Sequence, residues 1–273
     1  MTVINTNVSA LYSQNAMKTN ARAMSTAMEQ LSTGTRVNSA KDDAAGLAIG
    51  QNMTSQIRGL NMAVRNLNDG INMMQTAEGA MIEQSNMLQR MRELAVQSMN
   101  GTYSSVQRSY LDLEFQQLNS QINDISTDTT WNDQVLLDDS VGTFTFQAGQ
   151  ASGQTISIVI GDMGNGSTGL AISGESIDTY ANSATALTAI TSALESINQQ
   201  RATIGAGINR MEYAVDNLTN ISSNATQSRS TIMDTDYATA TTALAKTQII
   251  QQAATAMLAQ ANQQSQGVLQ LLK

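Results

Sequence analysis

VNSAKDDAAGLAIG, at residues 37–50, and MLQRMRELAVQSMN, at residues 87–100, bracket the stretch from Ser39 to Asn100 that decides the fold. Between them apolar residues recur at alternating intervals of three and four, the heptad spacing that keeps one stripe of a helix against a partner. We therefore predict one long helix, far longer than the average of about 11–12 residues. The stripe consists of Ile57, Leu60, Val64, Leu67, Ile71, Met74, Met81, Leu88 and Ala95.

A second apolar row lies on another face of this helix and predicts packing on more than one side. It consists of Ala77, Ala80, Met87, Met91 and Leu94. At the start of the helix, Ser39 followed by Asp42 resembles a capping box with Asp in place of Glu. Asp42 and Asp43 would then stand in the first helical turn, where carboxylates interact favourably with the helix dipole.

The composition argues against several classes of function. The 273 residues include no proline, cysteine or histidine, and 4% are aromatic. A chain without proline suits long helices. The absence of cysteine and histidine removes the usual nucleophiles, general bases and transition-metal ligands. We therefore expect no enzyme activity, metal site or cofactor. The net charge of −8 disfavours binding to nucleic acid. With no long apolar window and no Sec signal peptide, we expect no membrane insertion, and composition alone predicts a cytoplasmic protein.

Helices are also predicted at both ends of the chain and directly after the long helix. Heptad rows run through residues 1–31 and from residue 233 onward. A helix at about 104–127 should fold back antiparallel onto the long helix, because Asn100 and Gly101 form only a short connection.

The middle of the chain changes its pattern. Alternating apolar residues at about 141–160 predict a β-hairpin, and GDMGNGSTG at 161–169 indicates a flexible, exposed loop. The heptad then returns from Ile177 to Leu218, and this helix is the natural partner of the first long one. Gly205 and Gly207 within it mark either a bend or a close approach to another chain.

These patterns predict a mainly α protein: long antiparallel helical rods or coiled coil, one small β-hairpin, and paired N- and C-terminal helices. The terminal helices are rich in Ala, Gln and Asn and carry one narrow apolar stripe each. Such a pair buries too little surface to offset the entropy of its own ordering, so it needs further partners. Other copies of the chain are the simplest source, and head-to-tail contacts that do not close generate a helical filament.

The sequence resembles bacterial flagellin over nearly its whole length. The matching blocks are INTNVSAL (4–11), LSTGTRVNSAKDDAAGLAI (31–49), LQRMRELAVQS (88–98), DTDYATA (234–240) and LAQANQQSQGVLQLLK (258–273). The order and spacing of five such blocks is far more specific than a heptad alone.

This resemblance implies a domain organisation and a location. Residues 1–38 with 234–273 correspond to the terminal helical domain that lines the filament, and residues 39–233 to the adjoining rod domain with its hairpin. Only a short segment separates the helices of the rod, so the chain is similar to a flagellin without outer variable domains. Flagellins are secreted through the flagellar type III channel into an extracellular filament that serves motility.

The block LQRMRELAVQS carries the receptor site that the resemblance implies. By helical geometry Arg90, Leu94 and Gln97 lie opposite the seam of Leu88 and Ala95, so spacing alone indicates a solvated face with one exposed leucine. In flagellins this segment and a glutamate on the next helix are bound by the Toll-like receptor 5 of animal hosts. The resemblance predicts that the receptor binds the free monomer there, and that the same surface contacts the next subunit. The residues are Gln89, Arg90, Leu94, Gln97 and Glu114.

The resemblance also implies a polymerisation core in the terminal helices, where neighbouring subunits meet. Its predicted residues are Ile4, Val8, Leu11, Met257, Leu258, Val268, Leu269, Leu271 and Leu272. The implied partners are further copies of the chain in a helical homopolymer, the flagellar export apparatus, an export chaperone at the C-terminal end, and the cap protein.

Two other functions compete with a filament subunit. A hook–filament junction protein shares the terminal helices, although the LQRMRELAVQ block and the short centre favour flagellin. A secreted coiled-coil effector would bind host helices and would need no open-ended self-assembly.

Overall fold

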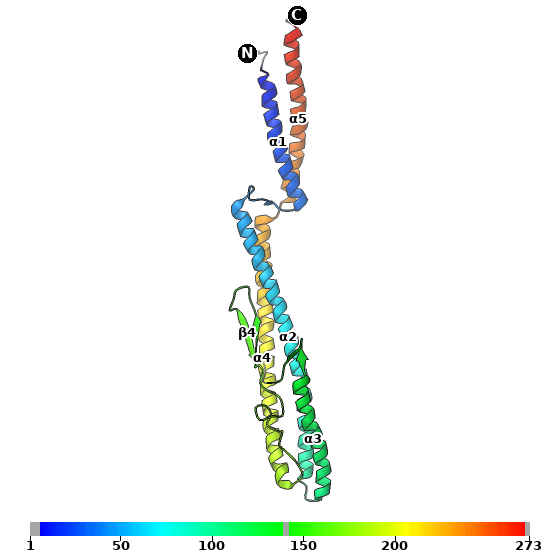
Figure 1. The fold of residues 1–273 in the computed structure, drawn as a ribbon. Coiled ribbons are helices and arrows are strands. Elements are labelled where there is room, and N and C mark those ends of the chain that lie inside the picture. Colours follow the sequence, from blue (N-terminus) through cyan, green and yellow to red (C-terminus); the bar gives the residue numbers. More distant parts are fainter. Residues whose placement is uncertain (1–5, 139–141, 271–273) are drawn as a thin grey trace. The chain divides into compact units, whose positions relative to one another are not determined.

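The computed structural model describes residues 6–138 and 142–270, and the chain divides into two compact units. The terminal unit comprises Met1–Ile57 with Ser223–Lys273, and the central unit comprises Arg58–Ser222. These boundaries fall inside the two longest helices, whereas the predicted domain boundaries, after residues 38 and 233, fall in adjoining connections and stay a prediction. The elements are α1 (Val8–Thr33), α2 (Ala44–Ser98), α3 (Ser105–Asp128), β1 (Thr130–Trp131), β2 (Gln134–Val135), β3 (Thr143–Gln147), β4 (Thr155–Val159), α4 (Tyr180–Met233) and α5 (Tyr237–Gln270) (Figure 1).

The core of the central unit lies between α2 and α4, as the heptad rows predict. Near one end of the pair, Ser222 Oγ donates to Asn61 Oδ1 (2.9 Å), and near the other, Ser183 Oγ donates to Ser98 Oγ (3.1 Å), so the helices run antiparallel. Along this stretch residues seven apart are buried on each helix: Leu60, Leu67, Met74, Met81 and Leu88 on α2, and Ile190, Ile197, Ile204, Met211 and Leu218 on α4. The predicted helical class, with long antiparallel helices, is confirmed.

The helix α3 folds back along α2, also as predicted. Its first turn is fixed by a capping box, in which the Ser104 hydroxyl accepts from the Gln107 N–H and the Gln107 side chain accepts from the Ser104 N–H. Phe115 and Ile122 of α3 are fully buried. The buried Gln84 amide of α2 donates to the carbonyl of Ile122, which ties the two helices together. The second apolar row of α2 is therefore the face that α3 covers.

The predicted hairpin consists of β3 and β4, paired antiparallel with Phe144 opposite Ile158. Side chains of the hairpin approach both long helices closely at glycine positions. A Cβ added to Gly70 of α2 would lie only 2.8 Å from the Phe146 ring, and one added to Gly207 of α4 only 2.5 Å from Ile158 Cδ1, so no larger residue fits at either position without a shift. Gly207 was predicted to mark a bend or an approach to another chain. It instead makes room for the hairpin of the same chain.

We expect the substitution Gly70→Leu to loosen the hairpin. The new side chain would overlap the Phe146 ring, and overpacking of this kind costs about 1–3 kcal/mol. Hydrogen exchange should accelerate across 143–159. Gly79 lies on the same helix, and a Cβ added there would meet nothing within 4 Å, so Gly79→Leu should leave hairpin exchange unchanged. Equal hairpin protection in both variants would contradict the packing described here.

Two local features differ from the sequence analysis. A second, smaller hairpin joins β1 to β2 through Asn132 and Asp133, whose φ angles of 50° and 63° suit the tight turn. The segment 161–169, predicted to be flexible and exposed, is in part buried: Met163 lies in the core, and its N–H donates to the carbonyl of Leu137. The glycines and polar residues of this segment form turns that pack on the unit, so the exposed-loop interpretation is wrong for most of it.

Candidate functional site

The helices α1 and α5 of the terminal unit lie side by side and antiparallel (Figure 1). Asn7 Nδ2 donates to the carbonyl of Ala261 (3.1 Å), and Asn20 Nδ2 donates to that of Thr247 (2.7 Å). Among the described side chains of the two helices, the buried apolar ones are Ala27 and Ala240. Burying alanine removes little apolar area compared with leucine, whose burial contributes about 1.5–3 kcal/mol. The predicted pairing of the terminal helices is confirmed, and the contact is thin.

Large apolar side chains of this pair face solvent instead. They are Val8, Leu11, Tyr12 and Met28 on α1, and Tyr237, Ile249, Ile250 and Met257 on α5. Between the two helices runs an open groove of about 710 Å³, whose lining includes Ala16, Ala23 and Ala243 together with Tyr12 and Ile250. Exposed apolar side chains along such a groove are typical of a surface that another molecule covers.

The predicted polymerisation residues fall into three groups. Val8, Leu11 and Met257 are exposed, and Leu258 is half-buried. Ile4, Leu271 and Leu272 lie outside the described residues, as do the side chains of Val268 and Leu269. Their role in assembly stays a prediction.

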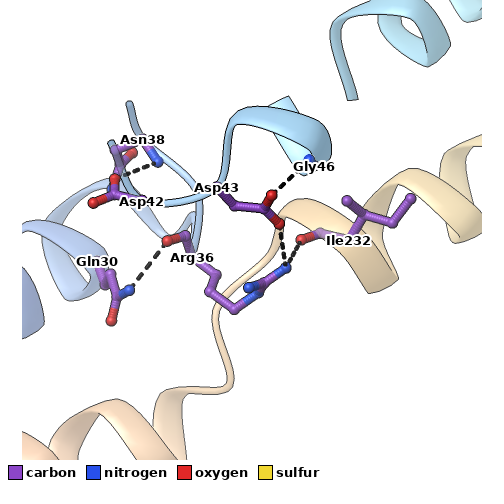
Figure 2. A network of polar contacts seen from close by, with 7 residues as sticks. All are labelled: Gln30, Arg36, Asn38, Asp42, Asp43, Gly46 and Ile232. Carbon is purple, nitrogen blue, oxygen red and sulfur yellow. Dashed lines mark hydrogen bonds and ion pairs between the residues drawn. The ribbon is translucent and has the colours of Figure 1, made fainter. Parts of the chain in front are cut away.

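The connections between helices in the terminal unit are joined by a polar network around Arg36 (Figure 2). The Arg36 guanidinium donates to the carbonyl of Ile232 (2.7 Å) in the last turn of α4, and it lies 3.9 Å from the Asp43 carboxylate. The Gln30 amide of α1 in turn donates to the carbonyl of Arg36 (3.1 Å). One arginine therefore contacts the end of α4, the end of α1 and the residue before α2. No sequence pattern singles out Arg36, because a lone arginine in a short connection carries no periodic signal.

The network also corrects the predicted start of the long helix. The helix α2 begins at Ala44, and Asp43 caps it by accepting from the Gly46 N–H (2.8 Å). Asp42 lies before the helix, in a turn where its carboxylate accepts from the N–H and hydroxyl of Ser39, and these bonds lower the pKa of Asp42. The Ser39–Asp42 pair is thus a turn before the helix, and the predicted capping box is wrong.

Asp236 should make the start of α5 sensitive to acid. Its carboxylate accepts from the Thr239 hydroxyl and from the N–H groups of Thr239 and Ala238, which lower its pKa below the ordinary value of 3.8. A lowered pKa stabilises the folded state above pH 3.8, and this stabilisation is lost as pH falls through the folded-state pKa. We expect Asp236→Ala to speed further the already rapid amide exchange of the monomer at residues 237–241 near neutral pH, and the difference from wild type to vanish well below pH 3.8. The variant Asp236→Asn keeps a capping oxygen but cannot titrate, so amide exchange at the start of α5 should depend less on pH. If exchange in this variant accelerated in acid as much as in wild type, the Asp236 carboxylate would not be the cause of the acid sensitivity.

The predicted receptor surface centres on an ion pair between α2 and α3. Arg90 Nε and Nη2 each lie 2.9 Å from Glu114 Oε1, and Nη1 lies 2.9 Å from Glu93 Oε2. The carboxylates of Glu93 and Glu114 raise the pKa of Arg90 above its usual range. Gln89 and Gln97 are exposed on the same side, and Gln97 Nε2 donates to the Tyr103 hydroxyl (2.9 Å).

Leu94 does not belong to this exposed surface. It is 1% exposed, because α3 folds back over the face of α2 that spacing alone assigned to solvent. The exposed apolar side chains nearby are Val96 on α2 and Val106, Tyr110 and Leu113 on α3. These residues were not predicted from the sequence, although the three on α3 follow helical spacing, which indicates a second stripe.

Comparisons with known proteins identify the family. The profile of the bacterial flagellin N-terminal helical region matches residues 4–142, and that of the bacterial flagellin C-terminal helical region matches residues 187–272. A flagellin of Halalkalibacterium halodurans is 44% identical over 271 residues, which cover 99% of this chain and 100% of that protein. The chain belongs to the bacterial flagellin family. It is thus a structural subunit of the flagellar filament, and it assembles with copies of itself.

The comparisons also support the short form of flagellin. Flagellin B of Vibrio cholerae is 35% identical, and the alignment covers 98% of this chain and 99% of that protein. The alignment is 371 positions long, whereas this chain has 273 residues. The Vibrio protein therefore carries residues that have no counterpart here. The crystal structure of Bacillus cereus flagellin superposes with a TM-score of 0.51 at 31% identity, covering 56% of this chain and 88% of that one.

A hook-associated protein shares the fold. The structure of a putative flagellar hook-associated protein from Vibrio parahaemolyticus has a TM-score of 0.56 at 16% identity and covers 70% of this chain and 99% of that one. At this identity the likeness concerns the fold alone.

Within residues 6–138 and 142–270, no helix has the length and apolar character needed to cross a bilayer.

Proposed function

We propose that this flagellin builds a filament that drives swimming, and that the exposed faces of α1 and α5 pack against other copies within it. The observation that carries this proposal is the terminal helix pair, which buries alanine while Leu11, Tyr12, Ile249 and Met257 face solvent. Neighbouring copies remove this surface from water, and the favourable free energy of that burial drives polymerisation. The contacts are head-to-tail, so growth continues without closure.

Family membership supports a proposed set of partners for this role. The chain leaves the cell through the flagellar type III export apparatus, an export chaperone binds its C-terminal end before secretion, and the cap protein takes part in assembly outside the cell. The mature location is then the extracellular filament. The apolar residues of the C-terminal end, Val268, Leu269, Leu271 and Leu272, serve both the chaperone contact and the polymerisation core.

The test combines assembly with motility. Purified monomer, seeded or salted out, should grow long filaments of uniform width in electron micrographs, and expression in a bacterium without its own flagellin should restore swimming. A monomer that stays dispersed under all seeding conditions would instead favour the secreted effector. Filaments without swimming would limit the role to a structural subunit.

The free monomer has a second proposed role as a ligand of the animal Toll-like receptor 5. Arg90 and Glu114 form an exposed ion pair between two helices, with Gln89 and Gln97 beside it, and an arginine in such a setting is a frequent hot spot. Leu94 acts by holding α3 against α2 rather than by direct contact. Purified monomer should activate a receptor reporter cell, and Arg90→Ala should abolish most of the response. The control variant Arg65→Ala removes a charge elsewhere on α2 and should leave the response unchanged. If wild-type monomer produced no response, this proposed role would be excluded.

A further inference from the structure

The described methionines range from fully buried to strongly exposed, and Met17, Met24, Met53, Met87, Met99 and Met233 are half-buried between these extremes. Met74, Met81, Met91 and Met211 are fully buried in the core of the central unit. Among the described residues, the strongly exposed ones are Met28, Met62 and Met257, with exposed fractions of 55%, 48% and 63%. Because a reagent in solution reaches a thioether more readily the more accessible it is, the strongly exposed methionines should react first and the fully buried ones last.

Two of the three exposed methionines lie on the terminal helix pair. Met28 is on α1 and Met257 is on α5, whereas Met62 is on α2 in the central unit. Under the proposed function, other copies of the chain cover the exposed faces of α1 and α5. These two thioethers are then open in the monomer and shielded in the filament.

We propose that Met28 and Met257 are oxidation sites at which a peroxide blocks assembly of the monomer without unfolding it. This inference rests on the proposed packing of the terminal pair. In the reaction the thioether sulfur attacks one oxygen of hydrogen peroxide, the O–O bond breaks, and the sulfur is oxidised to a sulfoxide while the peroxide is reduced to water. A methionine sulfoxide reductase, with a thiol as electron donor, returns the thioether, so the block is reversible.

The physical consequence differs between the two units. A sulfoxide is a polar hydrogen-bond acceptor, and burying it under a neighbouring copy without a donor is unfavourable. In the monomer the same group stays in water and costs nothing. The core methionines are out of reach, so the packing between α2, α3 and α4 survives mild oxidation.

The test treats monomer and preformed filament with dilute hydrogen peroxide and locates the sulfoxides by peptide mass spectrometry. We expect oxidation at Met28, Met62 and Met257 in the monomer, with Met28 and Met257 spared in the filament. The critical concentration for seeded growth of oxidised monomer should rise about tenfold or more, the change expected for burying an unpaired polar group. Circular dichroism should be unchanged, and treatment with a reductase should restore growth.

Variants identify the responsible sites, each compared with its own unoxidised sample. The double substitution Met28→Leu and Met257→Leu should remove the effect of peroxide, whereas Met62→Leu should leave it intact. Equal growth of oxidised and unoxidised wild type, with both sulfoxides present, overturns this inference while the filament function stands. A double variant still blocked by peroxide overturns it too, because the damage then lies elsewhere. Unoxidised wild type that never grows filaments counts against the proposed function itself.

Discussion

Replacing Leu11 by glutamate should abolish filament growth while the monomer keeps its helical content. Leu11 lies on α1 with 51% of its surface exposed, so a carboxylate there can stay hydrated in the monomer. Once a neighbouring copy covers the position, the charge must lose its water without gaining a partner, which is strongly unfavourable. Seeded growth followed by sedimentation and electron microscopy measures assembly, and circular dichroism measures the helices.

The matched control is Leu11→Met, which keeps an apolar side chain of similar volume and should still grow filaments. Comparison of the two variants separates charge burial from a general disturbance of α1. Normal filaments from the glutamate variant would show that this face is not an assembly surface.

Truncating Phe115 to alanine should destabilise the central unit by about 3–5 kcal/mol, because Phe115 is fully buried where α3 packs on α2 and its loss leaves a cavity. Urea denaturation can be followed through Trp131, the one tryptophan of the chain, which packs against the same core. The expected result is a large fall in the unfolding midpoint with an unchanged denaturant slope.

Leu113→Ala is the control for this experiment. Leu113 lies two residues away on the same helix and is 64% exposed, so its truncation should change the free energy of unfolding by no more than about 0.5 kcal/mol. Similar losses in the two variants would mean that α3 presents a different face to α2.

The sequence revealed the elements whose signal is periodic. The heptads through Leu67 and Met81 on α2, and through Ile197 and Ile204 on α4, identify buried seams because one face of each helix repeats every seven residues. The alternation of Phe144 with its neighbours likewise identifies β3. Each of these signals is local and can be seen without knowing what packs on it.

The features that periodicity missed depend on contacts between distant residues. Leu94 received two conflicting predictions, because the second apolar row places it on a packed face whereas its position opposite the seam places it in solvent, and its burial in the fold decides for the packed face. The segment 161–169 has the composition of an exposed loop, but the Asn165 amide of this loop reaches Asn119 on α3. The role of Gly207 is equally invisible, because only the folded chain brings Ile158 to it.

Arg36 illustrates the same limit within the terminal unit. Its bond to the carbonyl of Ile232 joins residues that are far apart in the sequence, and neither lies in a repeating pattern. The exposed face of the terminal pair could be predicted, by contrast, because narrow stripes on helices rich in small and polar residues already indicate too little buried surface.

The central claim is that α1 and α5 become stably ordered only when other copies cover them. Amide hydrogen exchange on dilute monomer and on assembled filament, read over residues 8–33 and 237–263, tests it most directly. We expect rapid exchange of both segments in the monomer, slow exchange of both in the filament, and slow exchange of the α2–α4 core in monomer and filament alike. Full protection of both terminal segments in the lone monomer would contradict it.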